Sequence, residues 1–277
     1  MNHIRTNRFE GWYFHHQIGD TTLSFIPGHT KGEAFLQVNA NSQSYQYPIS
    51  NLSITRGHIL ADQCTFSRKG CRIALPDING QIQYRNLTPL RSDIMGPFQY
   101  LPMQCRHGVI SMHHSLLGSI SIRGEKTDFT NGNGYIELDC GTSFPQSYLW
   151  LQCNDFTEKC ALMVSLAHIP FCGSSFTGCI CAIIYKGQEY RLATYRCVQI
   201  LAYQKDHITL LQGKLLLDID IVPSNDGHPL RSPVKGSMKG TIHESNNATI
   251  HVRLWKNGKQ ILHLISNHAM YEYVPSR

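Results

Sequence analysis

The sequence predicts an all-β protein with two antiparallel β-barrel halves, residues 1–145 and 146–277. Short segments rich in β-branched and aromatic residues recur along the whole chain, and Gly, Asn, Asp or Pro bounds each of them. Dipeptides typical of hairpin turns separate many of these segments, and no segment sustains the period of an α-helix. Strands that follow one another in this way pair antiparallel and form barrels or sandwiches.

The strands are expected in a regular order along the chain. The clearest are residues 22–27, 33–40, 72–76, 161–170, 179–185, 190–203, 248–255 and 260–273. Turns are expected at Asn79-Gly80, Lys186-Gly187, Asp226-Gly227 and Asn257-Gly258. Enough strands lie on each side of residue 145 for two barrels of about eight strands, a size that holds one small ligand. The turn at 141–145 should join the halves, and any helix should be as brief as residues 101–107.

The composition indicates a globular protein and argues against several partners. With 277 residues, 42% of them hydrophobic, the chain can bury a large core. Its 25 basic and 19 acidic residues are scattered singly, so we expect no nucleic-acid partner. The polar N-terminal run lacks the apolar core of a signal peptide, and no stretch approaches the roughly 20 apolar residues of a membrane span. We therefore expect a cytoplasmic protein without a transmembrane segment; the oligomeric state is open.

Neither the cysteines nor the histidines show the spacing of a metal site. The ten cysteines include no C-x-x-C pair, so we expect them to be packed free thiols. His107 and His113 would share one face of a strand but lie about 20 Å apart. Adjacent histidines such as His15 and His16 would point to opposite faces. We therefore predict no bound metal and no cofactor.

The segment YIELDCGTSFPQSYLW, residues 135–150, concentrates acids and aromatics. Along an extended strand Tyr135, Glu137 and Asp139 point to one face, with the two carboxylates about 7 Å apart. After the turn, one face carries Tyr148, Trp150, Gln152 and Asn154, and the other carries aliphatic residues. A face of aromatic and amide side chains is more typical of a ligand cavity than of a solvated surface.

The N-terminal segment RFEGWYFHHQ repeats this pattern. Glu10, Trp12, Phe14 and His16 would lie on one face, and Gly11, Tyr13, His15 and Gln17 on the other. An acid among aromatics is partly desolvated, which raises its pKa and keeps a proton available for general acid catalysis. The alternative is that Glu10 or Glu137 forms a structural ion pair with an arginine at a barrel rim.

Four segments together resemble the ordered motifs of the tocopherol cyclase family, particularly its bacterial branch. They are FEGWYF (9–14), MGPFQYLPMQCRHGVISM (95–112), GYIELDCGTSFPQSYLWLQCNDF (134–156) and HPLRSPVKGSMKGTIHES (228–245). The resemblance implies a lipocalin-like fold of two β-barrel halves, shared with carotenoid hydratases and some bacterial and fungal cyclases. The chain departs from the plant pattern at Leu138, Cys140 and Gln104, where the plant proteins have Lys, Trp and commonly an acid.

The chemistry that the resemblance implies is proton-initiated and needs no metal or redox cofactor. An acid protonates the double bond of a prenyl tail, and a neighbouring hydroxyl captures the cation inside a dry, aromatic pocket. The predicted catalytic residues are Glu137, Asp139 and Glu10, with Glu137 ranked first. The predicted ligand contacts are Trp12, Tyr13, His107, His113, Tyr135, Phe144, Tyr148, Trp150, Gln152 and Asn154.

The sequence leaves three functional hypotheses open. The first is a cofactor-independent cyclase, isomerase or hydratase acting on a hydrophobic prenylated or polyphenolic molecule. The second is a lipocalin-like protein that binds or carries such a molecule without transforming it. The third is an interaction protein whose barrels are filled by side chains. Only the first requires a desolvated acid within reach of a ligand double bond, and the substrate itself is not specified.

All ten cysteines should react with a thiol reagent after denaturation without reductant, because none is expected to be in a disulfide. Elemental analysis of the purified protein should find less than one zinc or iron per chain. Fewer reactive thiols, or one tightly bound metal ion per chain, would show that the interpretation of the cysteines or of the cofactor-free chemistry is wrong.

Overall fold

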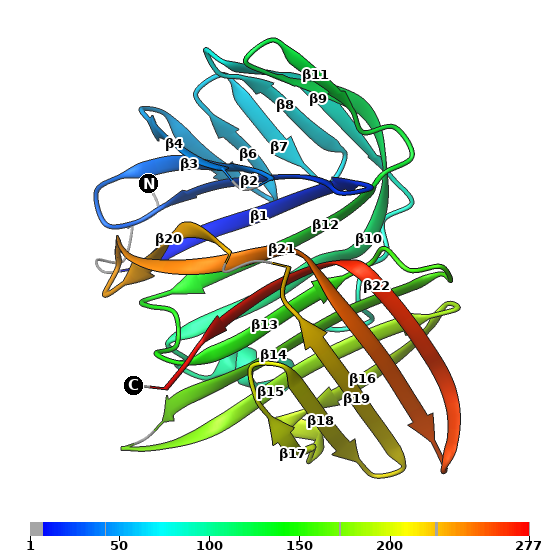
Figure 1. Ribbon diagram of the computed structural model, residues 1–277. Coiled ribbons are helices and arrows are strands. Elements are labelled where there is room, and N and C mark those ends of the chain that lie inside the picture. The colour runs from blue at the N-terminus through cyan, green and yellow to red at the C-terminus, as the bar shows by residue number, and fades with distance from the viewer. Residues whose placement is uncertain (1–7, 42, 172, 225–226, 277) are drawn as a thin grey trace. The chain divides into compact units, whose positions relative to one another are not determined.

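A computed structural model describes residues 8–41, 43–171, 173–224 and 227–276 (Figure 1). The chain forms two compact units, and each unit contains more than one stretch of sequence. The first comprises Met1–Pro89, His107–Thr142 and Pro233–Met238, and the second comprises Leu90–Arg106, Ser143–Ser232 and Lys239–Arg277. Both units are built almost entirely from antiparallel strands, which confirms the all-β prediction.

The described residues of the first unit form a twelve-stranded antiparallel sheet. Its hydrogen-bonded order is β4-β3-β2-β1-β12-β10-β9-β8-β7-β6-β5, and β11 pairs with β10. The strands are β1 (Phe9–Ile18), β2 (Thr21–His29), β3 (Ala34–Ala40), β4 (Gln43–Ile49), β5 (Leu52–Thr55), β6 (His58–Ala61), β7 (Cys64–Ser67), β8 (Gly70–Ala74), β9 (Ile78–Arg85), β10 (Cys105–Ile122), β11 (Glu125–Asp128) and β12 (Asn133–Gly141).

A ten-stranded antiparallel sheet occupies most of the described second unit. Its order is β16-β15-β14-β13-β22-β21-β19-β18-β17, and β20 pairs with β21. The strands are β13 (Tyr148–Cys153), β14 (Cys160–Phe171), β15 (Ser174–Tyr185), β16 (Gln188–Ala193), β17 (Gln199–Tyr203), β18 (His207–Gln212), β19 (Leu215–Val222), β20 (His228–Val234), β21 (Ser237–Lys256) and β22 (Lys259–Val274).

The sheets are larger than the predicted barrels of about eight strands. Many of the added strands, such as β5, β6 and β7, are four residues long and carry too little pattern to be recognised singly. The pairings of the described strands run from β4 to β5 in one sheet and from β16 to β17 in the other. Closure of either sheet into a barrel therefore stays a prediction.

Each sheet packs one face around its own apolar core. In the first unit Phe14, Phe25, Phe66 and Ile136 are completely or almost completely buried in one cluster. In the second unit Leu149, Leu151 and Cys153 from β13 join a cluster of aliphatic residues. Because side chains alternate along a strand, the intervening residues of β1, β12 and β13 lie on the face away from these cores.

Two of the predicted turns are present, and one prediction is wrong. Lys186-Gly187 joins β15 to β16 and Asn257-Gly258 joins β21 to β22, each with two positive φ angles. Asn79-Gly80 instead lies inside β9, where Gly80 faces Ile120 of β10. A Cβ at Gly80 would lie 2.3 Å from the Ser119 carbonyl oxygen, so the glycine permits close strand approach rather than a turn. Asp226 lies outside the described residues.

Helical structure among the described residues is limited to two short 3-10 helices, Gly96–Tyr100 and Thr194–Arg196. The first precedes the segment 101–107, whose last residues already belong to β10. The second interrupts the predicted strand 190–203 and separates β16 from β17. No helix in the described part of the chain has the length and apolarity needed to span a membrane.

The nine described cysteines are free thiols, and Cys172 lies outside the described residues. Most are buried in the two cores. Burial raises the pKa of the Cys71, Cys153 and Cys179 thiols to about 12. These side chains therefore stay protonated and contribute as small apolar groups.

The first unit buries several neutral histidines in its sheet. His16 Nδ1 donates to the Leu23 carbonyl oxygen at 2.9 Å, so its Nε2 accepts from the Tyr84 hydroxyl at 2.7 Å. His114 lies against Tyr84, with ring centroids 4.4 Å apart, and a Cβ at Gly134 would lie 2.2 Å from its Nε2. Burial lowers the pKa of His16 to about 4 and the pKa of His114 well below its usual value.

The first unit should therefore lose stability as the pH falls. The unfolded chain protonates His16 near pH 6.5 but the folded unit only near pH 4, so the free energy of unfolding is highest above pH 6.5 and falls between these values. The contribution of His16 alone is roughly 3 kcal/mol. Urea unfolding from pH 7 to pH 4.5 measures it, and His58→Gln, at an exposed histidine of β6, should keep the same pH dependence. A flat profile would contradict this account.

Candidate active site

The antiparallel pairing of β1 with β12 brings the N-terminal motif beside the acidic segment. In this register Tyr13 lies opposite Glu137 and Gly11 opposite Asp139, and Glu10 lies opposite Cys140. Directly opposite residues of an antiparallel pair share a face of the sheet. Glu137 and Asp139 therefore lie on the face away from the apolar core, whereas Glu10 lies on the other face.

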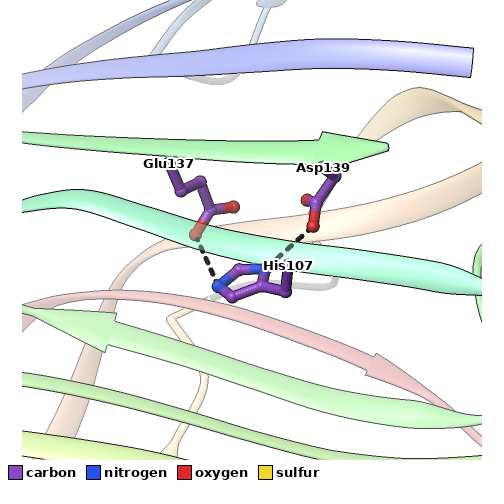
Figure 2. A group of neighbouring side chains, drawn as sticks. All are labelled: His107, Glu137 and Asp139. Atoms are coloured by element: carbon purple, nitrogen blue, oxygen red, sulfur yellow. Dashed lines mark hydrogen bonds and ion pairs between the residues drawn. The ribbon is translucent and has the colours of Figure 1, made fainter. Parts of the chain in front are cut away.

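Figure 2 shows the His107 ring between the carboxylates of Glu137 and Asp139. His107 comes from β10, and the two acids come from the neighbouring strand β12. His107 Nδ1 lies 2.8 Å from Asp139 Oδ1, and Nε2 lies 3.4 Å from Glu137 Oε2. The side chains of His107 and Glu137 are only 12% and 8% exposed, so both interactions form in a largely desolvated setting.

Tyr135 extends this cluster along β12. Its side chain is fully buried, and its hydroxyl donates to Glu137 Oε2 at 2.7 Å. Burial, followed by the nearby Glu137 carboxylate, raises the pKa of Tyr135 well above its usual value. The phenol therefore keeps its proton and acts as a fixed hydrogen-bond donor to Glu137.

The geometry of the cluster suits a doubly protonated His107 ring. A neutral imidazole donates from one nitrogen and presents a lone pair at the other. Here both ring nitrogens face carboxylate oxygens, so the imidazolium form satisfies both acids while a neutral ring would set a lone pair against one of them. Two carboxylates and one imidazole ring thus converge at a largely desolvated position.

Among the described residues, two groups of side chains have a spacing that could also hold a metal ion. Ligand atoms of His107, Glu137 and Asp139 lie within 4.8 Å of one another, as do those of His207, Asp218 and Asp220 in the second unit. In the second group the Arg253 guanidinium contacts both aspartates, and hydrogen bonds with His207 first and Arg253 second lower the pKa of Asp220. That group is accounted for as an ion-pair network on the sheet surface.

Glu10 and Trp12 are not part of the His107 cluster. The Trp12 indole donates to Glu10 Oε1 at 2.9 Å, and its ring stacks on Phe14 with centroids 6.3 Å apart. Trp12 and Phe14 belong to the apolar core of the first unit. The sheet thus separates Glu10 from Glu137, and the register does not let these two acids share a proton.

The other predicted residues of the first unit lie on the same face as Glu137. Tyr13 is buried and stacks on His15, with ring centroids 5.9 Å apart. His113 shares a face of β10 with His107, but its Nε2 interacts with Asn133 Oδ1 at 3.0 Å. His113 therefore stands outside the central cluster.

In the second unit, β13 separates the predicted ligand contacts from the core as expected. Tyr148, Trp150 and Gln152 lie on the face opposite Leu149 and Leu151, and all three are buried. Phe144 packs edge-on against Tyr148 at 6.2 Å, and Asn154 is buried one residue beyond the strand.

Sequence reasoning missed two buried acids on this face of the second unit. The Tyr148 hydroxyl donates to Glu272 Oε2 at 2.6 Å, and Glu272 lies opposite Trp150 on one side and Glu244 on the other. Glu272 lies between two tyrosines in the predicted strand 260–273, but these tyrosines point to the opposite, core face of the sheet. An acid within a strand rich in aromatics is the sequence signal that could have identified Glu272.

A surface hollow of about 610 Å³ in the first unit contains none of the predicted site residues. It lies between the ends of β4, β6 and β8, and its lining includes Ile49, Cys64 and Leu75. Its walls carry no cluster of acids and histidines comparable to that around His107.

The fold and the His107 cluster define an all-β protein with a buried histidine–carboxylate group on the sheet face away from the core. The chain belongs to the tocopherol cyclase-like family, whose model matches residues 55–273. The matched range contains His107, Glu137 and Asp139, whereas the N-terminal motif of β1 precedes it.

Several solved structures share the fold. CghA, solved with Sch210972, has a TM-score of 0.63 at 9% identity, covering 97% of this chain and 88% of its own. A protein of Nitrosomonas europaea assigned as an AttH has a TM-score of 0.55 at 13% identity, covering 96% and 92%. Kievitone hydratase from Nectria haematococca has a TM-score of 0.51 at 10% identity, covering 97% and 88%. The comparison with curated proteins found no match.

Tyr148→Phe should lower the free energy of unfolding by about 1–3 kcal/mol, because the buried Glu272 carboxylate loses a hydrogen-bond donor. Urea unfolding measures the effect. Tyr185→Phe is the matched control, since the Tyr185 hydroxyl donates to an exposed glutamate, Glu158, and its loss should leave the midpoint unchanged. Equal urea midpoints for the two variants would show that the Tyr148–Glu272 hydrogen bond stabilises the fold no more than the exposed Tyr185–Glu158 bond.

Proposed function

We propose that the protein is a cofactor-independent cyclase, isomerase or hydratase that protonates a hydrophobic prenylated or polyphenolic molecule. The observation that carries the proposal is the His107 ring held between two carboxylates at a desolvated position. Proton transfer to a carbon–carbon double bond needs an acid that keeps its proton away from water. Membership in the tocopherol cyclase-like family supports this class of reaction.

The proton is carried by the His107 cluster rather than by Glu137 alone. The Tyr135 hydroxyl and the His107 ring both approach Glu137 Oε2, and both favour the ionised carboxylate. Glu137 is then protonated transiently from His107 Nε2 and passes the proton to the substrate. Asp139 holds the opposite ring nitrogen and fixes the ring orientation.

The remaining predicted contacts complete the proposal. Tyr13 and Tyr135 offer aromatic faces beside Glu137, and aromatic faces stabilise developing positive charge. On the second sheet, Tyr148 and Trp150 offer aromatic faces and Gln152 offers an amide group. Their direct contact with ligand, and closure of the sheets into barrels, belong to this proposal.

Glu137→Gln should slow turnover by about 10²-fold or more while ligand affinity and folding stay close to wild type. His107→Gln should have a similar effect, because glutamine cannot supply a proton to Glu137. The substrate can be sought by untargeted mass spectrometry of co-purifying molecules, and turnover measured as deuterium incorporation at carbon in D2O. Glu125→Gln, an exposed acid of β11, is the matched control and should retain full activity.

The outcomes separate the competing functions. Full activity of Glu137→Gln would show that the acid assignment is wrong, and Asp139→Asn, at the other predicted acid of the His107 cluster, would then be the next variant. A tightly bound co-purifying ligand without any deuterium incorporation would favour a carrier that does not transform its ligand. Unfolding of Glu137→Gln would identify Glu137 as part of a structural ion pair, whose breakage typically costs about 3–5 kcal/mol.

A further inference from the structure

His15 lies on the same sheet face as the His107 cluster but is not part of it. It is completely buried on β1 and stands opposite Tyr135 of β12. Tyr13, two residues earlier, stands opposite Glu137, so His15 and Glu137 are diagonal neighbours with Cα atoms roughly 7–8 Å apart. The titratable ring of His15 is thus one cross-strand pair away from Glu137, the proposed acid.

The hydrogen bonds around His15 determine its tautomer. The Ser24 hydroxyl donates its single hydrogen to the Tyr13 hydroxyl oxygen at 3.1 Å. Ser24 Oγ, 2.9 Å from His15 Nδ1, is therefore the acceptor of that contact, and Nδ1 carries the hydrogen. The neutral ring then presents a bare lone pair at Nε2.

This lone pair has no hydrogen-bond partner among the described residues, although the atom is buried. Burial, with the adjacent His16 as a second cause, lowers the pKa of His15 to about 3, and a weaker side-chain hydrogen-bonding interaction with Gln17, which does not meet the geometry of a hydrogen bond to Nε2, opposes the shift. The ring is therefore neutral at physiological pH. A buried acceptor without a donor is unfavourable, and a hydroxyl group is one donor that can pair with it.

We propose that His15 Nε2 accepts the hydrogen bond of the substrate's attacking hydroxyl group and takes its proton as the new carbon–oxygen bond forms. This inference rests on the proposed function. The π electrons of the double bond form a C–H bond with the proton delivered through Glu137. The hydroxyl oxygen forms a bond to the resulting cation, and its O–H electron pair returns to oxygen as the proton passes to His15. The net reaction adds O–H across C=C, and the protein regains its starting state when the proton returns from His15 to the His107 cluster.

The positions of Glu137 and His15 fit their proposed roles as proton donor and proton acceptor. An addition of this kind needs a proton donor at one carbon and a proton acceptor at the oxygen attached to the other, separated by the reacting atoms. Glu137 and His15 occupy diagonal positions on one face, so both can address one bound molecule. Ser24 and Tyr13 act as positioning residues because they fix the His15 tautomer.

The tautomer is tested without any ligand. Nitrogen NMR of uniformly ¹⁵N-histidine-labelled protein at pH 7 should show His15 protonated at Nδ1 and bare at Nε2. Ser24→Ala should remove this preference while leaving the His16 tautomer unchanged. A His15 ring protonated at Nε2 in the wild-type protein would overturn the inference.

The acceptor role is tested with two probes of nearly equal shape, 4-pentylphenol and its methyl ether, which lacks the hydroxyl donor. Calorimetry should show that the wild-type protein binds the phenol about tenfold more tightly than the ether. His15→Phe should abolish this preference, and His15→Gln, which keeps an acceptor, should restore part of it. His263→Phe, the same change at an exposed histidine of β22, should keep the wild-type preference.

Each outcome bears on one claim. A wild-type protein that does not prefer the phenol, or a His15→Phe variant that keeps the preference, overturns the role of His15. Equal binding of both probes with Glu137-dependent turnover intact removes only the His15 assignment. A phenol preference that depends on His15 without any deuterium incorporation supports the acceptor and contradicts the proposed reaction. If His15→Phe does not fold, the role of His15 is tested by the phenol preference of His15→Gln, which should be weaker than that of the wild type, and by the His15 tautomer measured by NMR.

Discussion

The antiparallel pairing of β1 with β12 is the constraint on which the candidate site depends. Its register runs without a shift from Phe9 opposite Gly141 to Gln17 opposite Asn133. Side chains along a strand alternate with a period of two, so a slip of one residue would move Glu137 into the apolar core and Ile136 out of it. The core contacts of Phe14 and Ile136 therefore hold the acids on the other face.

This pairing also explains why strongly polar groups persist at buried positions. A carboxylate taken out of water is costly unless hydrogen bonds and an opposite charge compensate for the loss. Glu137 has both, from the Tyr135 hydroxyl and the His107 ring. The same contacts that stabilise the Glu137 carboxylate also set it beside a second titratable group, the His107 ring.

The positions where the chain departs from the plant cyclase pattern are informative in this setting. Leu138 packs against the core, and Cys140 lies opposite Glu10, so both point to the face away from Glu137 and Asp139. Gln104 directly precedes β10, the strand that carries His107. The differences at 138 and 140 therefore alter the core side of the sheet and leave the histidine–carboxylate cluster intact.

The sequence by itself determined the strand content, the faces of β1, β12 and β13, and the family, because side-chain alternation and motif order are local properties. It did not separate Glu10 from Glu137, since the relative facing of two strands depends on their register. It also did not bring His107 between two acids that follow it by about thirty residues, or single out His15 and Glu272. Those relations arise from hydrogen bonding and strand pairing between distant segments, so only the tertiary structure decided them.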